Sequence, residues 1–231
     1  MADILFNGPA GRLEGCYHQA KQAGAPVAVV LHPNPQLGGH MNNKVVYALY
    51  QSFVQLGFSV LRFNFRGIGK SEGVYTGGDI TNEIADTLAA LDWIKTMNPE
   101  AAHCWMAGHS FGAVVGACVM MRRPDITGFV FVSPPANVYD FSFLTPCPAS
   151  GLVIQGALDT IVDESAVGTL AERLNMTRRV QVDYVLLPKA DHIYTNCLKD
   201  LFSAVVTHVP ELMASRGKLT TKKHKSATPK S

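Results

Sequence analysis

Residues 101–121 constrain the fold of this chain more than any other stretch. They comprise a short apolar run, the turn sequence Gly108-His109-Ser110-Phe111-Gly112, and a second apolar run rich in Ala and Val. Because glycine has no Cβ, a glycine on each side of the serine allows a very tight turn with backbone packed close to it. The pattern predicts a buried strand, a sharp turn that presents Ser110, and a buried helix.

The same stretch could also be considered as a membrane span. It contains no Asp, Glu, Lys or Arg, and a span needs about 20 residues. However, two histidines and a polar turn would then lie within the bilayer, where polar groups are costly. A buried strand and helix fit the sequence better, and no membrane association is expected.

Apolar runs that are typical of buried strands alternate with helical patterns along most of the chain. Two short strands are expected at 4–6 and 13–18, and further strands at 26–31, 58–63, 127–132, 151–155 and 180–187. Helices are expected at 45–56, 79–97 and 164–174, with a closing helix to about His208. In the helix at 79–97, Ile84, Leu88, Leu91 and Ile94 are expected to face the core, and Glu83, Asp86 and Asp92 to lie elsewhere. The alternation predicts a mostly parallel, twisted α/β sheet of about 7–8 strands with helices on both faces.

The length of 231 residues and the 47% hydrophobic content suit one sizeable domain, which we place at residues 1–214. Residues 215–231 contain six Lys or Arg and no acid, and they are expected to form a disordered tail. A solvated tail is the simplest interpretation, with contact to nucleic acid or acidic lipid as the alternative. No nucleic-acid partner is expected, and whether the chain forms a homo-oligomer is left open.

The five cysteines are an odd number without C-x-x-C spacing, and several lie in apolar runs. We expect reduced thiols in a reducing compartment. The N-terminus has no basic segment followed by an apolar one, so no signal peptide is expected and a cytoplasmic location is predicted. The histidines and cysteines show no metal-ligand spacing, so neither a metal nor a cofactor is expected.

Several residues with catalytic potential follow predicted strands. Ser110, Asp159 and His192 each come after a different strand, and parallel sheets gather such residues at one edge. A serine hydroxyl needs a base to become nucleophilic, and histidine is suited to that role. A carboxylate holds the histidine in the required tautomer. The chain order Ser, Asp, His is typical of one large class of hydrolases.

These motifs resemble those of the α/β-hydrolase superfamily, specifically its small lid-less bacterial carboxylesterases and its dienelactone-hydrolase-like members, over about residues 26–208. The resemblance implies that Ser110 is the nucleophile, Asp159 in the G-x-x-D-x-x-V turn the acid, and His192 after the last strand the base. Residues 66–71 resemble the family's R-G-x-G-x-S loop. The family usually has Asp two residues before the Arg, where this chain has Asn64, a difference that concerns the loop rather than the triad.

The resemblance also implies an oxyanion hole made by two backbone N–H groups. One belongs to Phe111, after the nucleophile. The other comes from the loop after the strand at 26–31, where Pro33 cannot donate, so Asn34 is assigned. His40 and Tyr75 are the candidate substrate-binding residues.

Alternatives for individual residues remain. Asp163 could replace Asp159, although it is well placed to cap the following helix. His109 is expected to be a packed or rim histidine, and Asp191 a loop residue. Residues 67–71 end like a phosphate-binding loop, but that loop needs glycine at position 64 and must open directly into a helix.

Fewer than twenty residues, including four prolines, separate the strands at 127–132 and 151–155. A cap domain does not fit there, so an open site that takes short-chain acyl esters is expected. The predicted function is that of a serine carboxylesterase that acts on a small-molecule ester through an acyl-enzyme. A peptidase, thioesterase or lactonase, and a non-catalytic binding module with the same fold, are the alternatives.

Overall fold

The computed structural model describes residues 2–176 and 180–224, with side chains described up to Ser215. One eight-stranded sheet has the order β1-β2-β4-β3-β5-β6-β7-β8. Strands β3 to β8 are parallel to one another, and β1 and β2 form an antiparallel hairpin that pairs with β4. The bounds are β1 (Ala2–Gly8), β2 (Gly11–His18), β3 (Val27–Leu31), β4 (Ser59–Phe63), β5 (Cys104–His109), β6 (Ile126–Val132), β7 (Ser150–Gly156) and β8 (Val182–Leu187). The predicted fold class is confirmed.

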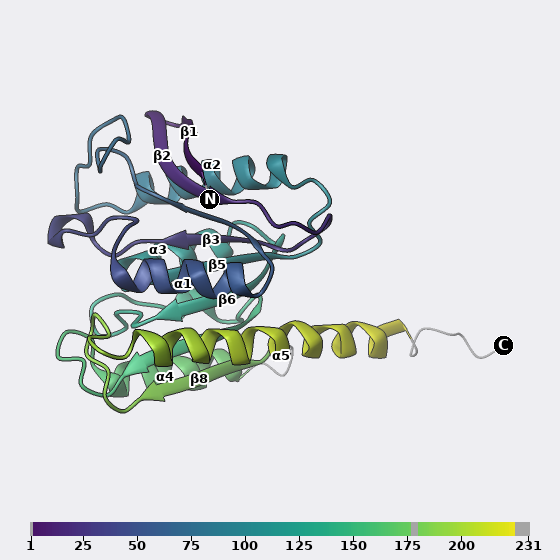
Figure 1. Cartoon of the computed structure of the whole chain (residues 1–231). Helices are drawn as coiled ribbons and strands as arrows, with labels where there is room; N and C mark the ends of the chain where they lie inside the picture. Colours follow the sequence, from purple (N-terminus) through teal and green to yellow (C-terminus); the bar gives the residue numbers. More distant parts are fainter. Residues whose placement is uncertain (1, 177–179, 225–231) are drawn as a thin grey trace.

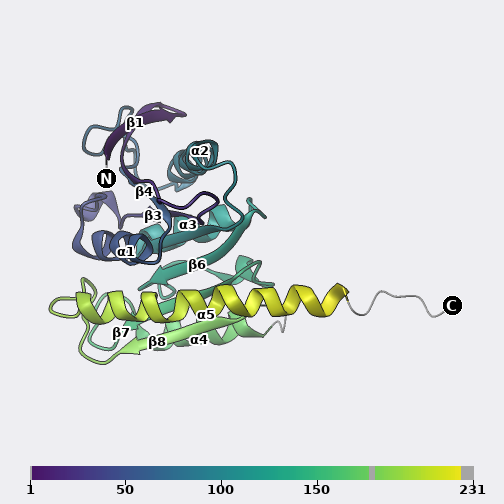
Figure 2. The same cartoon turned by 45° about the vertical axis from the view of Figure 1, so that its right-hand side comes forward.

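Helices cover both faces of this sheet (Figures 1 and 2). On one face lie α2 (Thr81–Met97), α3 (Phe111–Met120) and α4 (Glu164–Asn175), and on the other lie α1 (Lys44–Gln55) and α5 (Leu198–His224). Successive residues of β3 point to opposite faces, so Val29 belongs to the first core and Val30 to the second. This explains why the central strands read as unbroken apolar runs instead of alternating patterns.

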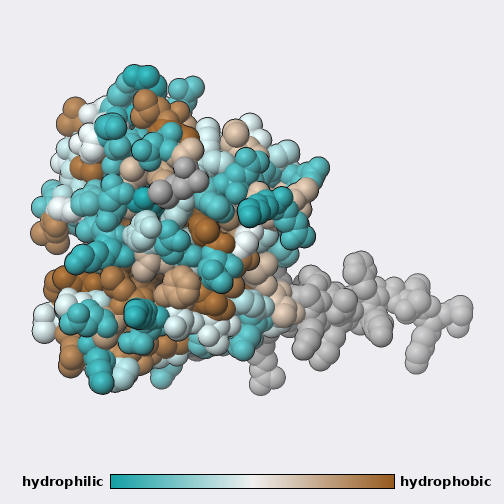
Figure 3. All heavy atoms as spheres, in the orientation of Figure 1, coloured by the Kyte–Doolittle hydropathy of each residue, from teal (hydrophilic) through white to brown (hydrophobic). Residues whose placement is uncertain are grey.

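The segment between β6 and β7 contains one short 3-10 helix (Ser142–Leu144) and no inserted domain. The expectation that no cap domain covers the sheet is therefore confirmed. Another short 3-10 helix (Pro35–Leu37) follows β3. Hydrophobic surface is visible where α1 and α5 meet, on the face shown in Figure 3.

Helix α5 is longer than the sequence analysis predicted. It continues past His208 to His224, so the predicted domain boundary at residue 214 falls inside a helix, and residues 215–224 are helical where a disordered tail was expected. The last turns extend beyond the sheet (Figure 1). Once a helix has begun, each further residue adds a backbone hydrogen bond, and no proline follows Pro210 until position 229. Residues 225–231 of the predicted tail lie outside the described residues.

The positions predicted for the acidic residues of α2 are only partly correct. Asp92 is exposed as expected, but Glu83 and Asp86 are buried. Asp86 Oδ1 accepts from Arg66 Nη2 at 2.6 Å, and its other oxygen accepts the Arg66 backbone N–H at 2.9 Å. A buried carboxylate is tolerated when it is paired in this way, and the pair ties the loop after β4 to α2.

The loop after β4 does not bind phosphate in the way that its sequence could suggest. Residues 67–70 form turns and α2 begins only at Thr81, so no helix opens at Ser71. The Ser71 hydroxyl donates to the Asn64 carbonyl oxygen at 2.7 Å, and Asn64 Oδ1 accepts the Met41 N–H at 2.8 Å. The interpretation of residues 67–71 as a phosphate-binding loop is therefore wrong, and Asn64 has a structural role in the loop.

The five cysteines are unpaired. Within the described part of the chain, none of the helices has the length and hydrophobicity that a bilayer crossing requires. The compartment remains a prediction.

Candidate active site

Ser110 lies between β5 and α3 in a strained backbone conformation. Its φ is 53° and its ψ is −118°, in a region that non-glycine residues rarely adopt. Its N–H donates to the Val132 carbonyl oxygen at 2.8 Å, which fixes the turn against β6. A Cβ at Gly108 would collide with the Gly112 carbonyl group, and one at Gly112 would lie 2.6 Å from the Leu31 carbonyl oxygen. Both glycines are therefore needed for the tight strand-to-helix turn, as predicted.

Asp159 and His192 are joined by a hydrogen bond. Asp159 follows β7 and His192 follows β8, and His192 Nδ1 lies 2.8 Å from Asp159 Oδ2. Because a carboxylate can only accept, the Nδ1 nitrogen carries the proton and Nε2 is left as the acceptor. The Asp159 side chain is fully buried, whereas 14% of the His192 side chain is exposed. The carboxylate is thus shielded and the imidazole reaches the surface.

Further donors hold the Asp159 carboxylate in place. Oδ1 accepts the backbone N–H groups of Ile161 and Val162, each at 2.9 Å, and Gln155 Nε2 donates to Oδ2 at 3.2 Å. Burial tends to raise the pKa of Asp159, but the hydrogen bonds from His192, Val162 and Ile161 outweigh it and lower the pKa to about 2. Asp159 is therefore ionised at neutral pH and can orient the imidazole.

Ser110 and His192 line the same cavity, which has a volume of about 960 Å³. Asn34, His40 and His109 also line it. Among the described residues, no hydrogen bond joins the Ser110 hydroxyl to the imidazole. In substrate-free enzymes this contact is often long and shortens only when a substrate binds.

The two competing carboxylates have other partners. Asp163 caps α4, with Oδ1 accepting the Ser165 N–H at 3.1 Å and Oδ2 accepting the Ser165 hydroxyl at 2.9 Å. The Asp191 carboxylate accepts the Thr195 N–H at 2.8 Å. The geometry therefore brings Asp159, and not its neighbours, to His192.

The loop after β3 approaches the nucleophile and is fixed by His32. Burial lowers the pKa of His32 to about 4, so the ring is neutral near pH 7. Its Nδ1–H donates to the Pro33 carbonyl oxygen at 2.8 Å, and Nε2 accepts the Phe65 N–H at 3.2 Å. This arrangement holds Asn34 at the cavity. Phe111 is the first residue of α3, where the first N–H groups have no acceptor within the helix. The oxyanion assignment to Asn34 and Phe111 stays a prediction.

The two candidate substrate-binding residues differ in their position relative to the cavity. His40 lines the cavity, and its Nδ1 accepts the Asn42 N–H at 3.1 Å. Tyr75 is not among the lining residues, and its hydroxyl donates to Asn34 Oδ1 at 3.3 Å. Tyr75 thus contacts the loop that carries Asn34, and its assignment as a substrate-binding residue stays a prediction.

His109 has a contact that sequence reasoning missed. The residue is buried, and its Nε2–H donates to the backbone carbonyl oxygen of His192 at 2.9 Å. The two rings lie side by side, with centroids 5.1 Å apart. The pKa of His109 is lowered to about 3, mainly by burial and further by the neighbouring His192. A neutral His109 therefore fastens the loop that carries the catalytic candidate His192.

We expect His109 to make the protein less stable in mild acid. The folded-state pKa of about 3 is below the unfolded value of 6.5, so the unfolded chain takes up the proton first. The contribution of His109 to the free energy of unfolding is constant above about pH 6.5 and decreases as the pH drops from 6.5 towards 3. Urea unfolding measures the free energy of unfolding at pH 7.5 and at pH 5. Between these two pH values the wild type should lose more of this free energy than His109→Gln, because glutamine cannot titrate. An equal loss in both proteins would contradict the assignment.

Comparison with known proteins places these observations in a family. Residues 37–149 match the family model described as "Serine aminopeptidase, S33". An uncharacterized protein of Rickettsia prowazekii is 44% identical over 209 residues, which is 89% of this chain and 87% of the relative. The sequence similarity thus extends beyond the part that holds Ser110 to nearly the whole chain.

Two solved structures are similar over nearly their whole length. A protein of Agrobacterium tumefaciens, described as an alpha/beta hydrolase of unknown function, is 43% identical with a TM-score of 0.88, and the match covers 93% of this chain and 97% of that one. A Xanthomonas campestris protein, described as a member of the a/b serine hydrolases without a lid, is 33% identical with a TM-score of 0.80, over 91% and 94% of the two chains.

Proposed function

Because the chain belongs to the α/β-hydrolase superfamily, among its small members without a lid, we propose that it is a serine hydrolase that cleaves short-chain carboxylic esters through an acyl-enzyme. The observation that carries the proposal is the 2.8 Å contact between His192 and the buried, ionised Asp159, at the rim of the cavity that holds Ser110. In a serine hydrolase such a carboxylate orients the imidazole and stabilises the positive charge that it gains during the reaction.

In the proposed reaction, His192 Nε2 takes the proton of the Ser110 hydroxyl while the serine oxygen attacks the ester carbonyl carbon. The backbone N–H groups of Asn34 and Phe111 receive the negative charge that develops on the carbonyl oxygen. The tetrahedral intermediate then expels the alcohol, which takes the proton from His192. An acyl group remains on Ser110.

Water completes the cycle. His192 Nε2 takes a proton from the water, whose oxygen attacks the acyl carbon, and collapse returns the proton to the serine oxygen as the acid leaves. Asp159 stays ionised throughout, in agreement with its lowered pKa. The open approach that follows from the missing cap supports short acyl groups over long lipid chains.

The family model's description raises aminopeptidase activity as a second candidate. An aminopeptidase has to bind the ammonium group of its substrate, for which a carboxylate in the cavity is the usual partner. No Asp or Glu is among the residues that line the Ser110 cavity. This lining favours an ester over a peptide with a free amino terminus.

The proposal is tested with 4-nitrophenyl esters from acetate to palmitate. We expect kcat/KM to be highest for acetate to butyrate and to fall for longer chains. Faster turnover of palmitate would contradict the short-chain part of the proposal. If no ester reacts, labelling by a fluorophosphonate indicates another acyl substrate, whereas folded protein that is not labelled indicates a non-catalytic binding module.

A further inference from the structure

The charged side chains that line the Ser110 cavity are all basic. The lining includes Lys44 and Lys199, and it includes no Asp or Glu. The overall charge does not explain this, because outside the basic tail the chain has more acidic than basic residues. The cavity that holds the candidate nucleophile thus carries two positive charges in a body that is otherwise net negative.

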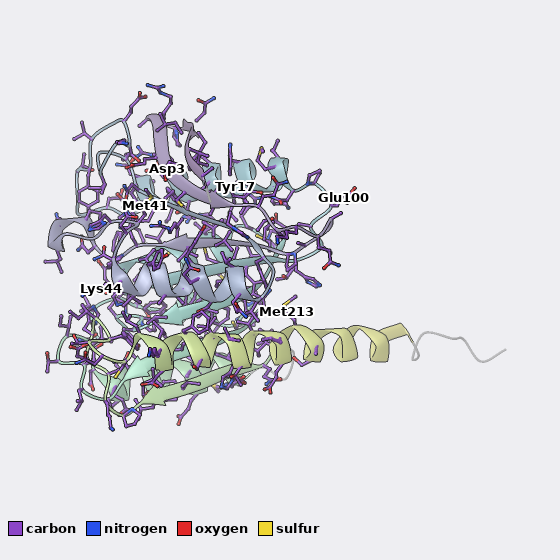
Figure 4. All side chains as sticks on the ribbon, in the orientation of Figure 1. Asp3, Tyr17, Met41, Lys44, Glu100 and Met213 are labelled. Carbon is purple, nitrogen blue, oxygen red and sulfur yellow. The ribbon has the colours of Figure 1, made fainter. Side chains whose placement is uncertain are left out.

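The two lysines come from helices that pack against each other. Lys44 is the first residue of α1, and Lys199 lies in the first turn of α5 (Figure 4 labels Lys44). Both helices cover the same face of the sheet and contribute to one apolar core. Lys44 and Lys199 therefore lie on the same wall of the cavity, although they are far apart in the sequence.

Neither lysine is neutralised by a carboxylate within the described residues. Both are exposed and neither takes part in an ion pair. Asp200, next to Lys199 in sequence, faces a different hollow between α5 and β8. Asp191 accepts the Thr195 N–H. Both lysines also line a second hollow between α1 and α5, so they stand between the two hollows and carry charges that no carboxylate pairs with.

The start of α1 adds to this positive character. Its first turn contains no acidic residue, and Asn43 at the N-cap makes no capping hydrogen bond. Asn43 Oδ1 instead accepts the His40 N–H at 2.6 Å. The helix dipole therefore remains uncompensated beside Lys44, at the same cavity wall.

We propose that Lys44 and Lys199 form an anion subsite, and that the preferred substrates are esters that carry a carboxylate or phosphate group on the part that lies against α1 and α5. This inference rests on the proposed ester hydrolysis at Ser110. Lysine is a compact, rotatable point charge, so the subsite would accept either anion without a fixed geometry.

The test compares mono-(4-nitrophenyl) adipate, which ends in a carboxylate, with its methyl ester, which has the same reacting end and no charge. The measured quantity is the ratio of kcat/KM for the anionic and the neutral ester, in the wild type, Lys44→Gln, Lys199→Gln and the double variant. Lys21→Gln is the matched control, because it removes the same charge in the loop before β3, at the opposite end of the parallel strands.

We expect the wild type to prefer the anionic ester and each Gln substitution at the subsite to lower the ratio about fivefold, as fits an exposed charge pair about 4 Å apart. Lys44→Glu with Lys199→Glu should make the neutral ester the better substrate. Adding 0.5 M NaCl should weaken the preference of the wild type, since salt screens exposed charges. The Lys21 variant should keep the wild-type ratio.

The inference would be overturned if the wild type showed no preference for the anionic ester. It would also be overturned if both Gln substitutions left the kcat/KM ratio unchanged, or if Lys21→Gln lowered the ratio equally. If neither adipate is turned over, the same ratio is measured for the rate at which a carboxylate-bearing fluorophosphonate and its methyl ester modify Ser110. Reaction with both probes without charge preference refutes only the subsite. No reaction with any ester or fluorophosphonate refutes the proposed function, and the subsite with it.

Discussion

Ser110→Ala is expected to lower kcat/KM for 4-nitrophenyl butyrate by about 10⁴- to 10⁶-fold. The substitution removes the oxygen that forms the acyl-enzyme, while the oxyanion donors and the cavity remain and can support only a weak residual reaction. Fluorophosphonate labelling should be lost in the same variant. Initial rates at substrate concentrations far below KM, together with mass spectrometry of the labelled protein, measure both effects.

Ser133→Ala is the matched control for this substitution. Ser133 is also a serine with positive φ, 45°, at the end of a neighbouring strand, and it is completely buried. Its hydroxyl lies 3.1 Å from the Tyr194 hydroxyl. Losing this hydrogen bond should reduce stability modestly, and labelling should persist. Substantial turnover by well-folded Ser110→Ala would refute the assignment of the nucleophile.

Asp159→Asn is expected to lower kcat by about 10⁴-fold with little change in the fold. The asparagine amide can present its NH₂ group to His192 Nδ1, which stabilises the tautomer with the proton on Nε2 and removes the base that faces Ser110. The negative charge that balances the imidazolium is lost as well. Single-turnover rates and the circular dichroism spectrum separate loss of chemistry from loss of structure.

Asp163→Asn provides the comparison, since Asn caps a helix about as well as Asp. This variant should retain kcat within a few-fold, because Asp163 contacts Ser165 and not His192. If Asp163→Asn proved the more damaging of the two substitutions, the acidic member of the triad would have been assigned to the wrong residue.

Sequence reasoning was most successful where the signal is local. The strand, turn and helix around Ser110 follow from two glycines and two apolar runs within 21 consecutive residues, and the structure shows that each glycine is required sterically. The eight-stranded fold follows from the alternation of short apolar runs with helical patterns. The proximity of Asp159 and His192 followed from their position after parallel strands and from the order of the three residues.

Contacts between distant segments could not be predicted in this way. A helical pattern marks Asp86 as polar but does not reveal Arg66, the partner that makes its burial tolerable. Nor does a histidine beside Ser110 indicate that its Nε2 reaches the backbone of His192. The end of α5 was misjudged because composition suggested a tail, whereas helix continuation depends on the turn already formed.

The residues proposed to contact the substrate were the least predictable. Tyr75 was chosen because it is an aromatic loop residue, yet its hydroxyl meets Asn34 and it does not line the cavity. Lys44 and Lys199 attract no notice in the sequence, because each stands alone at the start of a helix. Their shared position depends on the packing of α1 against α5, which no local pattern encodes.

The backbone of Ser110 has a consequence for the order in which the proposed site would form during synthesis. A residue in such a conformation persists only when its surroundings impose it, and one of the contacts that fix it here is the hydrogen bond from the Ser110 N–H to the Val132 carbonyl oxygen on β6. The ribosome makes β6 after Ser110, and Asp159 and His192 later still. A nascent chain that has exposed only the serine segment therefore carries an ordinary hydroxyl. Under the proposed function, the hydroxyl would become reactive only when the strands that carry Asp159 and His192 have been added, so the growing polypeptide would not attack esters before the sheet is complete.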